Sequence, residues 1–361
     1  MATAPSGPTC AGPLPLSELR LQWGIKTISD LEKCVSESTD EFLVEGWIPT
    51  KRIILAAGDS GLGKSPLMYQ LGLAVAAGID DVLGRKVQKG RVLYLDGENG
   101  LAEMKTSAKA LSKHLKLEQE PEEDFLMFSL NDAPPKWSAP GNHLNELIKA
   151  ARPALVVVDT LSTFWPGIEE KNTEASKKYA DLRTLISQYG CSFILVHHLK
   201  KPSDDGGAGG RCPLEDTGNV RRWFEGVRGA SALVNNADVR LGIDLPSTSG
   251  CRAKNVELVV GGFARVRGAI PVTHLTRERD EDGEPVGYRL VRRVELFDDC
   301  VQEFHRNLPP EFTHKQAKGI YGKGSEATGE ALGKLKAAGL VVQPKPRGPY
   351  RKLEPADLGD Q

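Results

Sequence analysis

Short apolar runs, each the length of one strand, recur through the middle of this chain. Segments with helical spacing join them, with apolar residues at intervals of three and four. Such runs are typical of parallel strands that are covered by helices on both faces. The pattern therefore predicts an α/β fold with a mainly parallel sheet. The runs are IILAAG (53–58), RVLYLDG (91–97), ALVVVDT (154–160), SFILVHH (192–198) and VELVVGGFARV (256–266).

Composition places the chain among ordinary globular proteins. It has 361 residues, of which 40% are hydrophobic and 26% charged, and its length corresponds to about two domains at roughly 150 residues each. No apolar run approaches the length of a membrane span, and the N-terminus lacks the pattern of a signal peptide. The six cysteines are scattered and form no CxxC pair. We expect a cytoplasmic protein with reduced cysteines and no membrane partner.

One motif points to a phosphate-binding loop. Residues 58–65 match GxxxxGKS, a strand precedes them, and the spacing after them predicts an amphipathic helix that tolerates Pro66 in its first turn. Glycines let backbone N–H groups wrap around phosphates, and the helix N-terminus adds a favourable dipole. The motif predicts binding of ATP, with Lys64 at the β- and γ-phosphates and the Ser65 hydroxyl on Mg²⁺. The loop residues are Gly58, Asp59, Ser60, Gly61, Leu62, Gly63, Lys64 and Ser65.

Two acidic residues at strand ends complete this predicted site. Asp159 ends the run LVVVD, where we expect a carboxylate that supports Mg²⁺ together with Ser65. Glu98 follows the run RVLYLDG and is a candidate base for an attacking water. Its neighbours Asp96 and Asn99 remain alternatives that could share or replace that role.

These pieces, in this order, resemble a RecA-fold ATPase with an AAA domain. The closest likeness is to the RepA-type hexameric helicases of plasmids and phages, and it runs from Gly46 to Asp244. The similar stretches are GWIP, GDSGLGKS, YLDGENG, VVVDTLSTF, ILVHHLKK and VRGASALVNNADV. The tract HLKKP…RGASAL also resembles phage primase-helicases, and RGASALVNNADV is similar to a stretch of DnaB-type helicases.

The resemblance implies roles for individual residues. It makes Glu98 the catalytic glutamate and His198 the residue that senses the γ-phosphate. His197 is the weaker choice, because adjacent strand residues face opposite sides. Arg228 corresponds to an arginine finger that reaches the nucleotide of the neighbouring subunit, which implies a homo-oligomeric, hexameric ring. The alternative for Arg228 is an ordinary surface arginine.

A glycine-rich segment between His198 and Arg228 corresponds to the loop that grips single-stranded DNA in the related helicases. Its cations suit contact with phosphates, which is independent of sequence. The segment also carries acidic residues, so a plain surface loop remains an alternative. Trp223 and Phe224 could stack on bases, although packing is the simpler interpretation. The candidate DNA contacts are Lys200, Lys201, Arg211, Arg221 and Arg222.

The C-terminal segment has a different pattern of predicted elements. Helices are predicted near residues 294–308, from a Thr313 cap to residue 320, and from a Ser325 cap to residue 338, followed by two short strands. This order resembles a winged-helix domain. Residues 311–353 hold nine Lys or Arg against three Glu. We expect contact with duplex DNA, or with a replication protein instead. The candidate contacts are Lys334, Lys336, Lys345 and Arg347.

Charge and organisation change along the chain. The totals of 47 Lys and Arg and 48 Asp and Glu balance, which by itself argues against a nucleic-acid partner. Binding depends on where the charges lie, however, and the C-terminal segment is strongly basic. A hairpin is also expected around Asp282-Gly283. The predicted parts are a tail (1–16), an acidic, helical lead-in (17–50), an ATPase motor (51–293), a winged-helix domain (294–353) and a second tail (354–361).

Three functions fit this pattern. The first is an ATP-driven ring helicase that translocates on single-stranded DNA in replication of a mobile element. The second is a RecA-fold DNA-dependent ATPase without helicase activity, such as a loader, recombination or defence factor. The third is a DNA-bound regulator whose nucleotide site only switches its shape. A catalytic glutamate and an arginine finger disfavour the third, since a switch needs neither.

Overall fold

The computed structural model describes residues 28–29, 41–133, 143–200, 212–216, 218–247, 256–265, 268–346 and 348–353. The chain separates into two units, Met1–Glu41 and Phe42–Gln361. Of the first unit, residues 28–29, which are helical, and Glu41 are described. The predicted tails and most of the predicted lead-in therefore lie outside the described residues.

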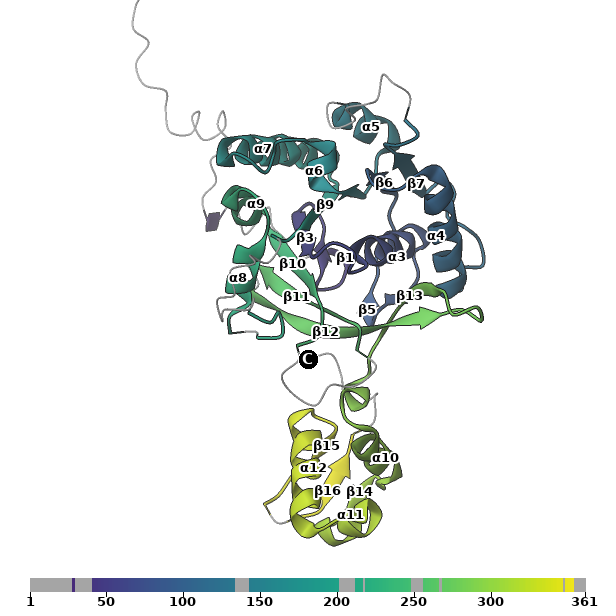
Figure 1. The fold of residues 1–361 in the computed structure, drawn as a ribbon, viewed down its shortest axis with the longest axis vertical. Coiled ribbons are helices and arrows are strands. Elements are labelled where there is room, and N and C mark those ends of the chain that lie inside the picture. Colours follow the sequence, from purple (N-terminus) through teal and green to yellow (C-terminus); the bar gives the residue numbers. More distant parts are fainter. Residues whose placement is uncertain are drawn as a thin grey trace, which may run out of the picture. The chain divides into compact units, whose positions relative to one another are not determined.

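A nine-stranded sheet forms the centre of the second unit (Figure 1), in the order β13-β12-β11-β10-β3-β9-β8-β6-β7. The strands from β10 to β7 run parallel, and β10 to β13 run antiparallel. The predicted α/β class with a mainly parallel sheet is confirmed. The strands are β3 (Ile53–Gly58), β6 (Val92–Asp96), β7 (Phe125–Ser129), β8 (Leu155–Asp159), β9 (Ser192–His198), β10 (Val239–Asp244), β11 (Leu258–Ala264), β12 (Gly268–Arg279) and β13 (Pro285–Leu290).

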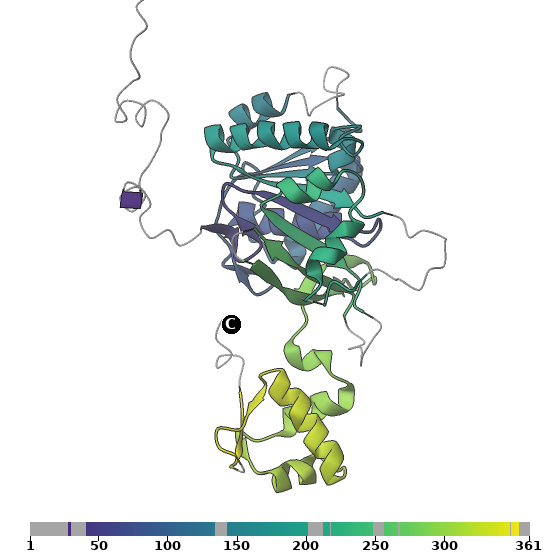
Figure 2. The ribbon, with the colours of Figure 1, turned by 90° about the vertical axis from the view of Figure 1, so that its left-hand side faces the viewer.

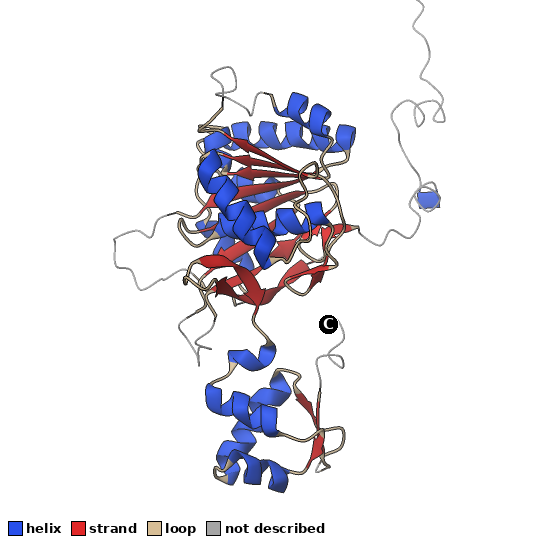
Figure 3. Cartoon of the chain, turned by 90° about the vertical axis from the view of Figure 1, so that its right-hand side faces the viewer, coloured by secondary structure: helices blue, strands red, loops and turns tan. Residues whose placement is uncertain are grey.

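Helices cover both faces of this sheet (Figure 2 and Figure 3). Alternate residues of each parallel strand enter two separate apolar cores, as Ile54 and Ile53 of β3 do. One core includes α3 and α4, and the other includes the helices from α5 to α9. The helices are α3 (Lys64–Ala77), α4 (Leu101–His114), α5 (Leu144–Ala151), α6 (Leu161–Phe164), α7 (Asn172–Tyr189), α8 (Val220–Trp223), η3 (Phe224–Gly226) and α9 (Ser231–Asn236).

Helix α3 differs from its prediction. The sequence indicates an amphipathic helix, but every residue from Leu67 to Ala76 is buried. The helix is enclosed because α4 and the short strand β1 (Phe42–Val44) contact it in addition to the strands of the sheet, among them β13. A helix that is buried all round carries no polar stripe.

The lead-in also differs. Two short antiparallel strands, β1 (Phe42–Val44) and β2 (Ile48–Pro49), stand where a helix was expected. Their residues Leu43, Val44 and Trp47 lie in the same core as α3, so the packed part of the motor begins before residue 51. A second small pair, β4 (Asp81–Val82) and β5 (Arg85–Lys86), follows α3.

Two strands of the large sheet, β7 and β10, are not predicted from the sequence. β10 lies between β3 and β11, yet Arg240 and Gly242 interrupt its apolar pattern. Arg240 is tolerated there because its guanidinium donates to the carbonyls of Val234 and Asn235 and lies over the Phe263 ring. The hairpin predicted at Asp282-Gly283 is confirmed as β12–β13.

The C-terminal residues form helices and a three-stranded sheet, β14-β16-β15. The helix expected over 294–308 is divided, because Asp298 caps a new helix by accepting from Val301 N–H. The Thr313 cap is confirmed, with a capping box to Gln316, whereas Gly324 and not Ser325 precedes the last helix. The elements are η4 (Arg293–Leu296), α10 (Asp299–Asn307), β14 (Glu311–Phe312), α11 (His314–Tyr321), α12 (Ser325–Ala337), β15 (Val341–Val342) and β16 (Tyr350–Lys352).

Across the described ranges, no helix combines the length and the apolar character that a membrane crossing requires.

Candidate nucleotide-binding site

Four parallel strands bring their carboxyl ends to one edge of the sheet. Gly58, which ends β3, is paired with His198 at the end of β9. Asp96, which ends β6, is paired with Asp159 at the end of β8. Ligands of open α/β sheets bind outside these ends. The topology therefore gathers the predicted site residues, although they come from distant parts of the sequence.

A cavity of about 330 Å³ lies at this edge. It is lined by Lys64, Ser65, Glu98, Asp159 and His198, each of which the sequence predicts for the site. The lining residues are Ser60, Gly61, Gly63, Lys64, Ser65, Pro66, Tyr69, Glu98, Asn99, Ser107, Asp159, Thr160, His198 and Arg277.

Lys64 lies at the start of α3 with only 5% of its surface exposed. Its Nζ donates to the Asp59 carbonyl oxygen at 2.8 Å and lies 3.3 Å from His198 Nδ1. Burial lowers the pKa of Lys64, and the carboxylates of Asp159 and Glu98 oppose that change. An ammonium held inside the loop in this way is placed to meet phosphate oxygens.

His198 connects Lys64 with Glu98. Its Nε2 lies 3.4 Å from Glu98 Oε1. Because an ammonium can only donate, Nδ1 accepts from Lys64, and the ring proton on Nε2 faces Glu98. Burial and the Lys64 charge lower the pKa of His198, so the ring is neutral near pH 7. The adjacent His197 faces away and contacts the Arg228 carbonyl oxygen at 2.9 Å.

Asp96 and Glu98, which the sequence leaves as alternatives, lie in different surroundings. Asp96 is fully buried and accepts from the Tyr69 hydroxyl, from the Asn99 amide and from the backbone N–H groups of Glu98 and Asn99. Its oxygens are thus occupied in holding the turn. The Glu98 side chain is 46% exposed and faces the cavity.

Asp159 has the features of a metal ligand. Its Oδ2 accepts from the Tyr94 hydroxyl at 2.7 Å, whereas its buried Oδ1 has no hydrogen-bond partner among the described residues. Burial raises the pKa of Asp159 to about 6, although the hydroxyls of Tyr94 and Ser65 lower it. A buried oxygen without a donor, beside a serine hydroxyl, suits the oxygen ligands that Mg²⁺ takes. The residues present therefore fit a magnesium ion.

Two residues of the hairpin β12–β13 reach the loop, and no sequence pattern indicated them. Arg277 Nη2 donates to the Leu62 carbonyl oxygen at 3.1 Å, and the Tyr288 hydroxyl donates to the Gly63 carbonyl oxygen at 3.1 Å. Local spacing cannot reveal such contacts, because the hairpin and the loop lie more than two hundred residues apart.

Arg228 lies outside the lining of this cavity. Its Nε forms an ion pair with Glu169 Oε2 of the same chain at 2.9 Å, and 59% of its side chain is exposed. The structure thus keeps Arg228 on a neighbouring surface, beside His197.

The predicted DNA contacts are only partly described. Lys200 Nζ donates to the Glu225 carbonyl oxygen, Arg221 lies over the Phe263 ring, and Arg222 is exposed. Trp223 and Phe224 are buried at 0% and 1%, so they pack in the core. Lys201, Arg211 and Arg347 lie outside the described residues.

Comparison with known proteins agrees with this geometry. Residues 25–204 match the model of a family described as an AAA domain, and the match includes the phosphate-binding loop, Glu98, Asp159 and His198. The chain contains a RecA-like P-loop ATPase domain. Such a domain binds a nucleotide, and P-loop ATPases usually bind ATP together with Mg²⁺.

Curated relatives resemble part of this ATPase. DNA repair protein RadA of Mycobacterium tuberculosis, in strains CDC 1551 and H37Rv, is 27% identical over 212 residues. The alignment covers 57% of this chain and 38% of RadA, so the chain matches well under half of that relative's length. Among solved structures, the KaiC-like protein of Pyrococcus horikoshii OT3 aligns with a TM-score of 0.40 and 14% identity, over 69% of this chain and 94% of that one.

Proposed function

We propose that this ATPase is a ring-forming, hexameric DNA helicase of RepA type, which translocates on single-stranded DNA in replication of a mobile element. The observation that carries the proposal is the series Lys64–His198–Glu98, with contacts of 3.3 and 3.4 Å. A protein that only switches on nucleotide binding needs no base next to the phosphate site. A glutamate linked to the phosphate lysine through a neutral histidine suits turnover coupled to motion.

Hydrolysis would use the chain's own groups in defined positions. Glu98 would accept a proton from the attacking water, since its carboxylate faces the cavity. Lys64 would stabilise charge on the transferred phosphoryl group. Its attraction to phosphate would loosen the contact with His198 and free the imidazole for the γ-phosphate. Mg²⁺, held by Ser65 and Asp159 Oδ1, would neutralise phosphate charge when bound.

Binding of single-stranded DNA is proposed for the segment after β9. Lys200, Arg221 and Arg222 flank residues 201–211, which the structure does not describe. Arg222 is exposed on α8 and is available to a phosphate, whereas Arg221 already packs on Phe263. We therefore assign the larger share of phosphate contact to Arg222 among the described pair.

The C-terminal elements support a second proposed contact. Their order, α10–β14–α11–α12–β15–β16, supports a winged-helix domain, in which we propose α12 as the recognition helix. Leu332 and Leu335 bury one side of α12, while Lys334 and Lys336 are exposed on it and Lys345 is exposed after β15. We propose that the exposed surface of α12, with the lysines on either side of Leu335, binds duplex DNA, and a replication protein is the alternative partner.

A second candidate function is supported by the similarity to RadA, whose name describes a DNA repair protein. A DNA-dependent ATPase that loads or remodels, without unwinding, would use the same nucleotide site. Unlike the helicase, this ATPase would hydrolyse ATP without separating the strands of a DNA duplex.

A strand-displacement assay separates the two candidates. We expect the full chain to release a labelled strand from forked DNA in the presence of ATP and Mg²⁺. Light scattering should show that the chain forms a particle with the mass of a hexameric ring. Glu98→Gln should bind ATP and form the same particle without releasing the strand. ATP turnover that DNA stimulates, with no strand released, would favour the loader or repair candidate. The absence of any turnover would contradict both.

A further inference from the structure

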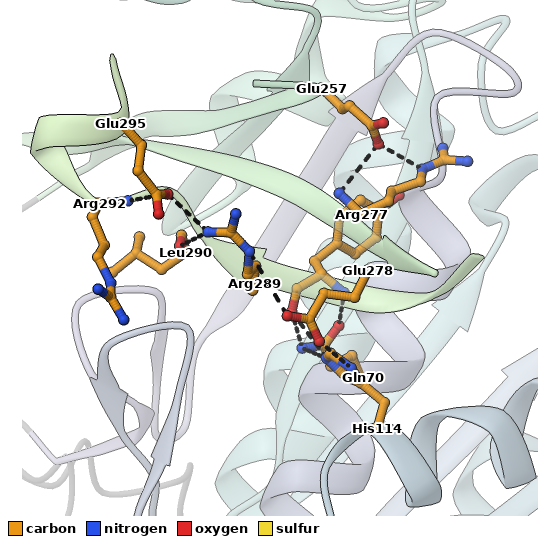
Figure 4. A network of polar contacts seen from close by, with 10 residues as sticks. Gln70, His114, Glu257, Arg277, Glu278, Arg289, Leu290, Arg292 and Glu295 are labelled. Atoms are coloured by element: carbon orange, nitrogen blue, oxygen red, sulfur yellow. Dashed lines mark hydrogen bonds and ion pairs between the residues drawn. The ribbon is translucent and has the colours of Figure 1, made fainter. Parts of the chain in front are cut away.

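A single arginine from the antiparallel side of the sheet lies against the phosphate-binding loop. Besides its bond to the Leu62 carbonyl oxygen, Arg277 has its backbone N–H on Glu257 Oε2 at 3.1 Å, with its Nε 3.9 Å from the same oxygen (Figure 4). Its side chain is 30% exposed. The guanidinium is therefore held at the rim of the nucleotide cavity, with its surface partly open.

The fit between hairpin and loop is close. The Arg277 guanidinium lies over the Tyr288 ring at 5.6 Å, and the Tyr288 hydroxyl bonds to the loop at Gly63. A Cβ at Gly63 would lie 2.6 Å from Arg277 Nη2 and would collide with the Tyr288 hydroxyl. Gly63 also has φ +92°, which favours glycine. The close approach of Arg277 to the loop therefore depends on a glycine at position 63.

Arg277 also lies where two cavities meet. It lines the phosphate cavity, and with Pro66 and Ser107 it lines an adjoining cavity of about 80 Å³. The walls of this smaller cavity are mainly apolar, including Leu111 of α4 and Val286 of β13. A nucleotide whose terminal phosphates lie at Lys64 can direct its base into the smaller cavity. The phosphate nearest the sugar would then pass Arg277.

The charge inside the phosphate cavity supports this placement. Among its described lining residues, Glu98 and Asp159 are acidic, and Lys64 and Arg277 are the cations. With Lys64 as the one cation, these side chains would sum to a charge of −1, and Arg277 brings the sum to zero. Arg277 has five N–H donors, of which one is directed at Leu62. Its Nε lies 3.9 Å from Glu257 Oε2, and the remaining N–H groups can form charge-assisted bonds with phosphate oxygens.

We propose that Arg277 is a nucleotide-binding residue, supplied by the same subunit, that binds the phosphate nearest the sugar. The proposal rests on nucleotide binding at the phosphate loop and extends the site to the hairpin β12–β13. It makes this hairpin part of the ATP site, in contrast to Arg228, which the family resemblance directs to a neighbouring subunit.

Calorimetric titration of the full chain with Mg²⁺–ADP and with a non-hydrolysable Mg²⁺–ATP analogue tests this proposal. Arg277→Gln removes the charge and the terminal guanidinium nitrogens and keeps a polar side chain. Because a charge-assisted hydrogen bond would be lost, we expect both dissociation constants to rise about 10- to 100-fold. The two factors should be similar, since both ligands have the same sugar end.

Three comparisons distinguish phosphate contact from a brace on the loop. Arg277→Lys should recover part of the affinity, because it restores the charge. The dependence of affinity on salt should weaken in Arg277→Gln. Arg279→Gln is the matched control, because Arg279 is exposed two residues further along β12 and donates to the Gly283 carbonyl oxygen of the hairpin. Its affinity should equal that of the wild type.

Several results would overturn the proposal. Unchanged affinity of Arg277→Gln for both ligands would remove Arg277 from the site. A loss confined to the ATP analogue would assign Arg277 to the γ-phosphate instead. A loss without rescue by Lys, at an unchanged salt dependence, would make Arg277 a brace only. Failure of the wild-type chain to bind either ligand would contradict nucleotide binding itself, which is a different outcome from the first three.

Discussion

Asp159 carries a charge that its surroundings oppose. Burial raises its pKa from 3.8 to about 6, so the folded protein holds a proton between these values that the unfolded chain releases. Stability from this proton is complete below pH 3.8 and is lost as the pH rises through about 6. The shift of about two pH units corresponds to about 3 kcal/mol. A magnesium ion at Oδ1 would offset that cost.

We therefore expect Asp159→Asn to be more stable than the wild type at pH 8 when Mg²⁺ is absent. Urea unfolding at pH 5 and pH 8 measures the difference, and roughly half of the total effect should develop between these values. Addition of Mg²⁺ and ADP should stabilise the wild type more than Asp159→Asn. The control is Asp282→Asn, at an exposed position of the hairpin. An Asp159→Asn protein that is less stable than the wild type at pH 8 would contradict the argument.

Helix α12 has a buried side and an exposed surface, and substitutions on the exposed surface test whether it binds DNA. Buried Leu332 and Leu335 fix one side, and exposed Lys334 and Lys336 are free to change without loss of core packing. We expect Lys334→Glu with Lys336→Glu to weaken binding of duplex DNA. The slope of log affinity against log salt should fall by about 2 units, one for each lost phosphate contact. Fluorescence anisotropy over a range of salt measures both effects.

The matched control for these substitutions reverses two charges on the motor. Lys149→Glu with Lys177→Glu changes the net charge by the same amount at exposed positions of α5 and α7. Equal weakening by both pairs would reduce the effect to overall charge and would remove α12 as the binding element. Unchanged DNA binding with loss of a protein partner would favour the interaction alternative.

Elements whose pattern is local could be predicted from the sequence. The phosphate loop, the strands that end at Asp96, Asp159 and His198, and the hairpin at Gly283 each have their signal within a few consecutive residues. Since parallel strands end at one edge, the sequence also brought Lys64, Glu98 and Asp159 to one site. β10 was missed because a buried arginine, Arg240, interrupts its apolar run, and its guanidinium is satisfied by the carbonyls of Val234 and Asn235 in the preceding helix.

Contacts made by tertiary packing could not be predicted. Gln70 of α3 accepts from the Tyr288 N–H and donates to its carbonyl, each at 2.8 Å, which fixes the hairpin on the loop helix. A further chain of polar contacts joins His114, Glu278, Arg289 and Glu295 (Figure 4). Each partner is an ordinary polar residue in its own segment, so no spacing marks it. The position of Arg277 on the loop follows from these contacts.

At the scale of the whole molecule, the position of Arg228 bears on whether one subunit or an assembly hydrolyses ATP. Within the chain it is neutralised by Glu169 at 2.9 Å and is absent from the lining of the phosphate cavity. The chain's own site therefore contains Arg277 and lacks Arg228. If Arg228 serves an adjacent subunit, its exposed side chain must exchange Glu169 for the neighbour's phosphate. ATP turnover would then require assembly, because each site would be completed by the next subunit.

Mixing two inactive variants tests this dependence. Arg228→Ala and Glu98→Ala should each lose turnover by about 10³-fold or more when alone. In mixed rings, about one interface in four would pair an intact Glu98 with an intact Arg228, so turnover should return in part. Arg52→Ala, at an exposed arginine directly before β3, is the control and should stay active in ATP turnover on its own. If mixed particles form, as size measurements would show, and turnover stays absent at every ratio, Arg228 does not act between subunits.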